Sequence, residues 1–368
     1  MSGTLAFYIT RRFILAVIGM LAALAMLFAL FDFVELLRRA ATHPEATLGI
    51  LTEITLLHLP WTALTLLPFA VLLGGIFCFW RLARSSELVV IRATGMSAWQ
   101  FLAAPVIAAA ALGAIATFGV SPISSACYNI AERLDDTYIR QTGGPVNFEG
   151  GELWLRQDDP GFEPGGSAIF HSQHLDVVHG ILVGGNVSVF RLDRTDKLIE
   201  RVEAKNAVLR DGNWDLIGAR TIKPDEMPSS VTSLLLPTDV TLQRVQQSFA
   251  SPDTLSVWAL PGFIAQLERA GFSSVRHRLH LQTLLALPLL AGTMALVAAG
   301  FSMRPTRRGG VARMLSGGVI SGFSLFAFSR FAEEFGQSGA LPAMLAAWAP
   351  AGAGLLLAVT LLLHLEDG

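Results

Sequence analysis

The run FILAVIGMLAALAMLFALF, residues 13–31, holds nineteen consecutive residues without a charged side chain. A helix needs roughly 20 apolar residues to cross a hydrocarbon layer about 30 Å thick. The run is therefore long enough to span a membrane, and it decides the fold class. Arg11 and Arg12 precede it. The run is too long for a signal peptide and lacks a small-residue cleavage site, so we expect a retained first span.

The composition of the 368-residue chain points the same way. Hydrophobic residues make up 52% of it and charged residues 15%, with a net charge of −2. Soluble domains are about 25% charged, and the mean hydropathy here is +0.52. These values exclude a soluble enzyme, a disordered chain and a nucleic-acid binder. They indicate a polytopic α-helical membrane protein.

Six membrane spans are predicted from the apolar runs. Their approximate limits are residues 13–34, 59–80, 98–120, 279–301, 314–331 and 341–363. Pro68, Pro288 and Pro350 lie inside the second, fourth and sixth runs. Prolines are tolerated in membrane helices where neighbouring helices or waters satisfy the freed carbonyl groups.

The arginines of the short connections predict the orientation. One side carries nine of them: Arg11, Arg12, Arg81, Arg84, Arg92, Arg304, Arg307, Arg308 and Arg313. The other side carries three: Arg38, Arg39 and Arg330. Since cytoplasmic loops carry the excess of basic residues, we expect both termini in the cytoplasm and the long third connection outside.

That connection, residues 141–251, predicts a separate water-soluble β domain. It holds all three lysines and fifteen of the twenty-nine acidic residues. Short strand-like runs alternate with turns, among them an Asp-Gly-Asn turn after Arg210. This pattern is typical of a sandwich or a jelly roll.

The predicted division of the chain follows from these runs. Residues 1–135 hold three spans and a cytoplasmic coupling helix at about 84–96, residues 136–252 form the jelly-roll-like domain, and residues 253–368 hold an interfacial helix and three spans. Ser256 is the expected cap of that interfacial helix, which runs to Arg269. We interpret His280, just before the fourth span, as an interfacial residue rather than a metal ligand.

The cytoplasmic segment RSSELVVIRATGMS, residues 84–97, predicts a short helix between two spans. Ser85 or Ser86 would cap it, Glu87 lies in its first turn, Arg92 in its last, and Gly95 ends it. Such a helix is a common docking element for the motor subunit of a transporter. The alternative, which the residues leave open, is a solvated surface helix.

The segment DFVELLRR, residues 32–39, is the second informative stretch, at the outer end of the first span. Arginines there oppose the orientation rule, and guanidinium groups bind phosphates bidentately. The functional interpretation is a site for an anionic lipid headgroup, made by Arg38 and Arg39. The alternative is a local salt-bridge set, because Glu35 lies three and four residues before them. Asp32 lies at the membrane boundary, where an acidic residue is usually paired or faces a cavity.

With these residues the chain resembles the LptF/LptG permeases of the bacterial lipopolysaccharide export system, and LptG more than LptF. The resemblance rests on FVELLRRA at 33–40, LPFAVLLG at 67–74, the 84–97 segment and AWAP at 347–350. It covers nearly the whole chain and includes the order of three spans, a β insert and three spans.

The resemblance implies a permease subunit of an ABC transporter that extracts lipopolysaccharide from the outer leaflet of the inner membrane and passes it to a periplasmic bridge. It implies an LptF-like partner subunit, an LptB-like ATPase dimer that holds ATP and Mg, and an LptC-like bitopic protein. No cofactor and no catalytic residue are expected in this chain, and nucleic acid is not a partner. The multi-pass chain would lie in the inner membrane, with its β domain in the periplasm.

The resemblance also assigns roles to residues. The ATPase-coupling residues would be Arg84, Ser86, Glu87 and Arg92. The lipopolysaccharide-binding residues would be Asp32, Glu35, Arg38, Arg39, Phe69, Phe323 and Phe326. Asp32 departs from the family pattern, in which a basic residue is common, and packing is the alternative role of the three phenylalanines.

Two other function classes make different predictions. A non-transporting scaffold that anchors a periplasmic β domain for envelope assembly would purify without an ATPase. An ion-driven secondary transporter fits poorly, because ionisable residues in the middle of the spans are nearly absent.

Overall fold

The fold is described from a computed structural model, which covers residues 3–366. Outside the described part lie residues 44, 86, 88–96, 141–145, 150–151, 160–166, 179–180, 195–196, 211, 224–226, 239–240, 242–250, 270–271 and 303–310. The chain forms two compact units. The helical unit contains residues 1–139, 252–261 and 275–368, and the sheet unit contains residues 140–251 and 262–274.

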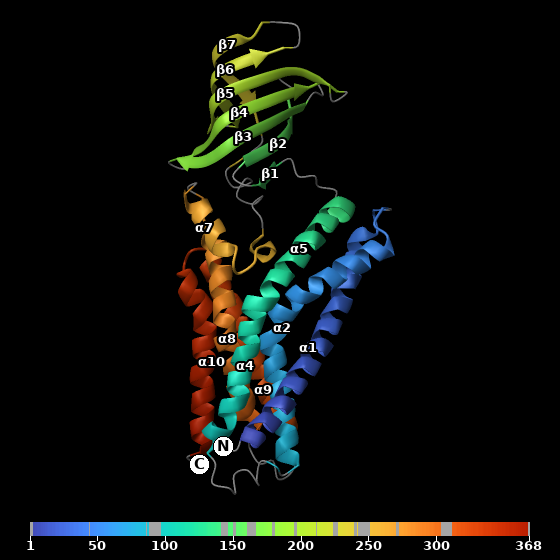
Figure 1. Ribbon diagram of the computed structural model, residues 1–368, viewed down its shortest axis with the longest axis vertical. Helices are drawn as coiled ribbons and strands as arrows, with labels where there is room; N and C mark the ends of the chain where they lie inside the picture. The colour runs from blue at the N-terminus through green and yellow to red at the C-terminus, as the bar shows by residue number, and fades with distance from the viewer. Residues whose placement is uncertain are drawn as a thin grey trace. The chain divides into compact units, whose positions relative to one another are not determined.

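The helical unit is built from long helices that run side by side (Figure 1). They are α1 (Gly3–Ala40), α2 (Leu48–Arg84), α4 (Ala98–Ile115), α5 (Ser121–Asp135), α8 (Val275–Ser302), α9 (Val311–Gln337) and α10 (Ala343–Glu366). Short π-helical turns η1 (Ala116–Val120) and η2 (Asp136–Arg140) follow α4 and α5, and the 3-10 turn η3 (Pro252–Thr254) precedes α8. Both termini lie at one end of this unit (Figure 1).

These helices are longer than the predicted spans. The 38 residues of α1 measure about 57 Å at about 1.5 Å per residue, against a hydrocarbon layer of about 30 Å. The predicted limits followed the apolar residues only, whereas the helices continue through polar flanks. Thr47, for example, caps α2 twelve residues before the predicted start of that span.

Among the described residues, five helices are long and apolar enough to cross a membrane. They are Thr4–Ala40, Leu48–Arg84, Trp99–Ile139, Val275–Ser302 and Ala343–Leu363. The predicted fifth span falls in α9, which is not one of the five. Glycines and serines between Ser316 and Gly322, together with Arg330, lower the hydropathy of its described part. The predicted fifth span, and with it the count of six, therefore stays a prediction.

A proline in α8 is matched by a neighbouring helix. Pro288 has no N–H, so the carbonyl group of Leu284, four residues earlier, loses its helical partner. The hydroxyl of Thr117, in η1, donates to that carbonyl oxygen at 2.7 Å. The helices approach closely here, since a Cβ on Gly113 would lie 2.6 Å from the Cα of Pro288. This contact confirms the expectation that neighbouring helices satisfy the carbonyl groups that prolines free.

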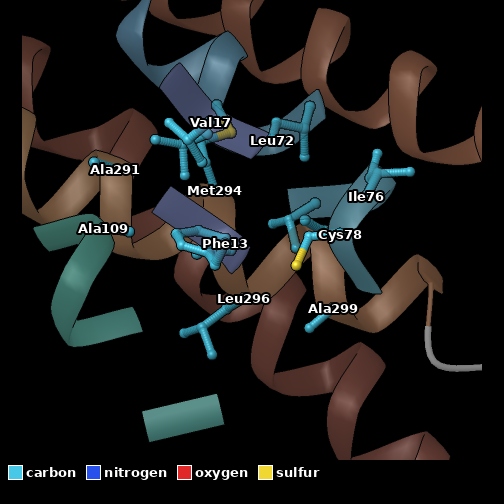
Figure 2. Packing of buried hydrophobic residues seen from close by; sticks show 14 of the residues in the cluster. Phe13, Val17, Leu72, Ile76, Cys78, Ala109, Ala291, Met294, Leu296 and Ala299 are labelled. Carbon is cyan, nitrogen blue, oxygen red and sulfur yellow. The ribbon is translucent and has the colours of Figure 1, made fainter. Parts of the chain in front are cut away.

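The core of the helical unit combines large apolar side chains with small residues where the helices approach each other closely. Figure 2 shows Phe13 and Val17 of α1 packed with Leu72 and Ile76 of α2 and with alanines of α4 and α8. A Cβ on Gly74 would lie 2.8 Å from the Cα of Val17, so the backbones of α1 and α2 nearly touch. Small residues allow such approaches between membrane helices.

The sheet unit contains one seven-stranded antiparallel sheet whose strands lie in chain order, β1 to β7. The strands are β1 (Val146–Glu149), β2 (Glu152–Asp158), β3 (Ser167–Val178), β4 (Ile181–Leu192), β5 (Leu198–Arg210), β6 (Asn213–Ile222) and β7 (Ser229–Pro237). The expected hairpin is confirmed by the register of Arg210 opposite Asn213, with Gly212 at a φ of 75°.

The strand order differs from the expected jelly roll. A jelly roll has two sheets and Greek-key crossovers, whereas the described strands form a meander in which each strand pairs with the next. Short turns between consecutive strands favour a meander, because a short turn can only connect two strands that lie next to each other. The strand expected at 240–245 lies outside the described residues, apart from Thr241.

The helix expected at the membrane interface packs on the sheet with its second half, and its place at an interface stays a prediction. Helix α7 (Leu260–Arg269) contributes to two apolar clusters. Its first residue, Leu260, packs with Val257 and Leu284 of the helical unit. Leu267 and Phe272 join the buried cluster around Trp214, which stacks on Phe170 with ring centroids 4.5 Å apart. The apolar side of this helix is thus covered by the sheet, and residues 262–274 group with the sheet unit rather than with the following spans.

Candidate functional site: an amphipathic cavity and the two ends of α1

A cavity of about 290 Å³ opens within the helical unit. Its apolar wall comes from α2, α8 and α9 and includes Leu64, Phe69, Leu287, Leu290, Met294 and Phe326. Phe69 and Phe326 meet edge to face with ring centroids 5.0 Å apart. Such a wall suits hydrocarbon, because apolar surface removed from water stabilises a complex by about 25 cal/mol per Å².

Charged and polar side chains line another part of the same cavity. They are Arg276 and His280 of α8, Arg330 and Glu333 of α9, Asp253 of η3, and Trp61 of α2. Arg330 pairs with Glu333 at 3.1 Å and lies over the ring of Phe326. No ion pair joins Arg276 to a described residue, and its side chain is exposed. The cavity is therefore amphipathic, with an apolar wall and a basic group that has capacity for an anion.

Asp253 contacts two other polar side chains of the cavity. The indole N–H of Trp61 donates to Asp253 Oδ1 at 3.0 Å, and His280 Nδ1 lies 3.7 Å from the same oxygen. The turn that carries Asp253 is thereby fixed to α2 and α8.

The end of α1 at residues 32–39, called the outer end after the predicted orientation, carries two separate polar contacts. Arg38 donates to both oxygens of Glu35, at 2.9 and 2.8 Å, and Arg39 donates to Glu35 Oε1 at 3.0 Å. The structure therefore contains the local salt-bridge set that the sequence offers as the alternative. The side chain of Arg38 is 76% exposed, so most of its donors remain available to a ligand.

Asp32 faces away from that set, toward α2. His58 Nδ1 lies 2.9 Å from Asp32 Oδ2. The ring of His58 contacts Tyr128 of α5, and Tyr128 contacts Trp61, with centroids 5.4 and 5.5 Å apart. A continuous series of side chains thus connects the outer end of α1 with the polar part of the cavity.

The opposite end of α1, around Tyr8 and Arg12, is called the inner end after the predicted orientation, and it contacts Glu87 of the predicted coupling helix. Glu87 accepts from Arg12 and from the hydroxyl of Ser85 at its Oε1, at 3.2 and 3.0 Å, and from Tyr8 at its Oε2, at 3.2 Å. Ser85 is the C-cap of α2, directly after Arg84, since its N–H donates to the carbonyls of Arg81 and Ala83.

The other predicted coupling residues are placed only in part. Arg84 lies at the end of α2 with its guanidinium 5.5 Å from the ring of Trp80. Ser86 and Arg92 lie outside the described residues.

The structure therefore brings together some predicted residues and separates others. Phe69 and Phe326 line the cavity, whereas Phe323 is 66% exposed and does not line it. Reasoning from sequence missed His58, Trp61, Tyr128 and Asp253. A signal existed for Trp61, because an aromatic residue with a polar N–H at the start of a span commonly finds a partner; Asp253 lay in a turn with no distinguishing pattern.

Comparison of the sequence with known proteins identifies relatives of this chain. The family model described as "Lipopolysaccharide export system permease LptF/LptG" matches residues 7–364. Two relatives are the lipopolysaccharide export system permease proteins LptG of Escherichia coli K12 and of Escherichia coli O6:H1 strain CFT073. Each is 23% identical to the chain over 98% of both lengths. The expected resemblance, to LptG in particular, is confirmed, and the chain belongs to the LptF/LptG family of lipopolysaccharide export permeases.

Proposed function

We propose that this chain is the permease subunit of an ABC transporter that extracts lipopolysaccharide from the outer leaflet of the inner membrane and passes it to a periplasmic bridge. Membership of the LptF/LptG family supports the substrate class. The amphipathic cavity is the structural observation that carries the proposal, because it offers one molecule an apolar wall and basic groups at once.

The cavity matches the chemistry of a phosphorylated glycolipid. Acyl chains would lie against Phe69, Leu290 and Phe326, and a phosphate or acidic sugar would reach Arg276. A volume of about 290 Å³ holds part of one acylated lipid rather than all of it. We therefore propose that an LptF-like subunit completes the cavity.

The outer end of α1 supplies the second anion site of the proposal. A phosphate would replace Glu35 as the acceptor for Arg38 and Arg39, and such pairs within one helix stabilise it by only about 0.2–0.5 kcal/mol. The unexpected Asp32 does not oppose this, because His58 is its partner. Asp32 would hold this end of α1 against α2 through His58, and Glu35 would hold the arginines until a phosphate replaces it.

Work would come from an LptB-like ATPase dimer that holds ATP and Mg, docked on the segment around Glu87, with Arg84, Ser86 and Arg92 in the same segment. An LptC-like bitopic protein would pack beside the helical unit. In this proposal α9 is the fifth of six spans, both termini are cytoplasmic, and the sheet unit lies in the periplasm.

Purification of the partners tests the proposal. The chain, solubilised in detergent with its neighbours from the membrane, should co-purify with an ATPase whose hydrolysis rate rises when lipopolysaccharide is added. Glu87→Ala should lower the amount of bound ATPase, and Glu53→Gln, at an exposed position of α2, should not. Purification with no ATPase in any detergent would support the scaffold alternative and overturn the proposal.

A further inference from the structure

Glu87 is held from α1 as well as from its own segment. Its two carboxylate oxygens accept three hydrogen bonds, from Arg12, Tyr8 and Ser85. Two of those donors lie 75 and 79 residues earlier in the chain, on a different helix. A link of this kind fixes α1 and the segment after α2 relative to each other.

The donors are themselves held in place. The guanidinium of Arg12 lies 4.5 Å from the centre of the Tyr8 ring, a contact that contributes about 0.5–1 kcal/mol at an exposed site. Phe13, the next residue, is fully buried and stacks on Phe79 of α2. Arg12 therefore projects from a rigid part of α1 and loses little freedom when it binds Glu87.

Glu87 also keeps a free side. Its side chain is 32% exposed, and a carboxylate has about four acceptor positions, of which three are used. A cationic group of a partner subunit can therefore reach Glu87 without displacing Arg12.

At its other end, α1 carries Asp32, Glu35, Arg38 and Arg39. The helix is unbroken from Gly3 to Ala40, so a displacement of its inner end moves its outer end as well. The contact with Glu87 thus connects the proposed motor site directly with the proposed anion site, in addition to the route through α2.

We propose that Arg12 and Tyr8 are positioning residues that transmit movement of the Glu87 segment into α1, so that ATP hydrolysis displaces the helix that carries the lipid-binding arginines. This inference rests on the proposed function. It assigns to Arg12 a role in coupling and not in docking of the ATPase.

The test uses the whole complex in detergent and in proteoliposomes that contain lipopolysaccharide. Arg12→Ala should leave the amount of co-purified ATPase and its basal hydrolysis unchanged. It should lower lipopolysaccharide extracted per ATP hydrolysed by about fivefold, the effect of losing one charge-assisted contact. Arg12→Lys, which keeps the charge, should restore more than half of the yield, and Tyr8→Phe should give an intermediate loss.

Arg11→Ala is the matched control, because the exposed side chain of Arg11 makes no ion pair with a described residue. An unchanged yield per ATP in Arg12→Ala would overturn the inference and leave the proposed function standing. Loss of the ATPase from the Arg12→Ala complex would also overturn it, since Arg12 would then belong to the docking surface. A wild-type complex with no ATPase would overturn the proposed function itself.

Discussion

The two ends of α1 hold their charged side chains in different ways. At the inner end, Arg12 reaches across to Glu87 beyond the end of α2, whereas at the outer end Arg38 and Arg39 bind Glu35 on their own helix. A contact between two helices transmits a displacement of one helix to the other. A contact within one helix can be exchanged for a ligand without moving either helix. We infer that the inner end transmits movement and the outer end binds.

The largest expected effect comes from separating α1 from α2, which would disturb both ends at once. Gly74→Leu places side-chain atoms where the backbone of Val17 lies, and overpacking of this kind costs about 1–3 kcal/mol. Thermal unfolding in detergent should show a clearly lower Tm. Gly19→Leu, at a position on α1 with nothing within 4 Å of an added Cβ, is the control. Equal Tm values for the two variants would contradict the close packing of α1 on α2.

The next effect concerns binding at the outer end. Replacing Arg38 and Arg39 together by Ala should weaken photocrosslinking of lipopolysaccharide to α1 about a hundredfold, because charge-assisted hydrogen bonds contribute about 1.5–3 kcal/mol each and about 1.4 kcal/mol is a factor of ten. Glu35→Gln should act in the opposite direction, since it removes the competing acceptor. If both variants crosslink like wild type, Glu35 and the arginines form only a local salt-bridge set.

The smallest effect is expected at Asp32, whose polar contact with His58 joins the outer end to α2 beside the apolar packing of Leu36 on Leu51. The pair is partly exposed, so its loss costs at most about 1 kcal/mol, or a Tm decrease of about 1–2 °C in a chain of this size. Asp32→Asn and His58→Gln should each show it, and the double variant should show no further decrease. Additive effects would mean that the two residues do not interact.

The apolar periodicity of the sequence predicted the helical part well, because membrane spans are specified by local composition. The run at residues 13–31 is enough to place α1, and Pro288 is enough to predict a contact such as that of Thr117. The ends of the helices were not predictable in this way. Polar residues such as Thr47 continue a helix beyond the hydrocarbon layer when capping and packing favour it.

The site was predictable only where the residues are near each other in the chain. Glu35 with Arg38 and Arg39 follows from helical spacing. By contrast, the pairs Arg12 with Glu87, Asp32 with His58, and Trp61 with Asp253 join residues 75, 26 and 192 positions apart. No local pattern encodes these contacts, since they depend on how the helices pack. Strand order in the sheet unit has the same origin, and the expected jelly roll was wrong for the described strands.

The central claim is that lipopolysaccharide binds in the cavity. Photocrosslinking from a residue in the cavity wall tests this most directly. A photoreactive residue at Phe326 should capture lipopolysaccharide in cells, and the capture should fall when ATP hydrolysis by the partner is allowed to proceed in purified complexes. The same residue at Leu356, which is 72% exposed on α10 and outside the cavity, should capture little. Equal capture at Phe326 and Leu356, or none at Phe326, would contradict a lipid-binding role for the cavity.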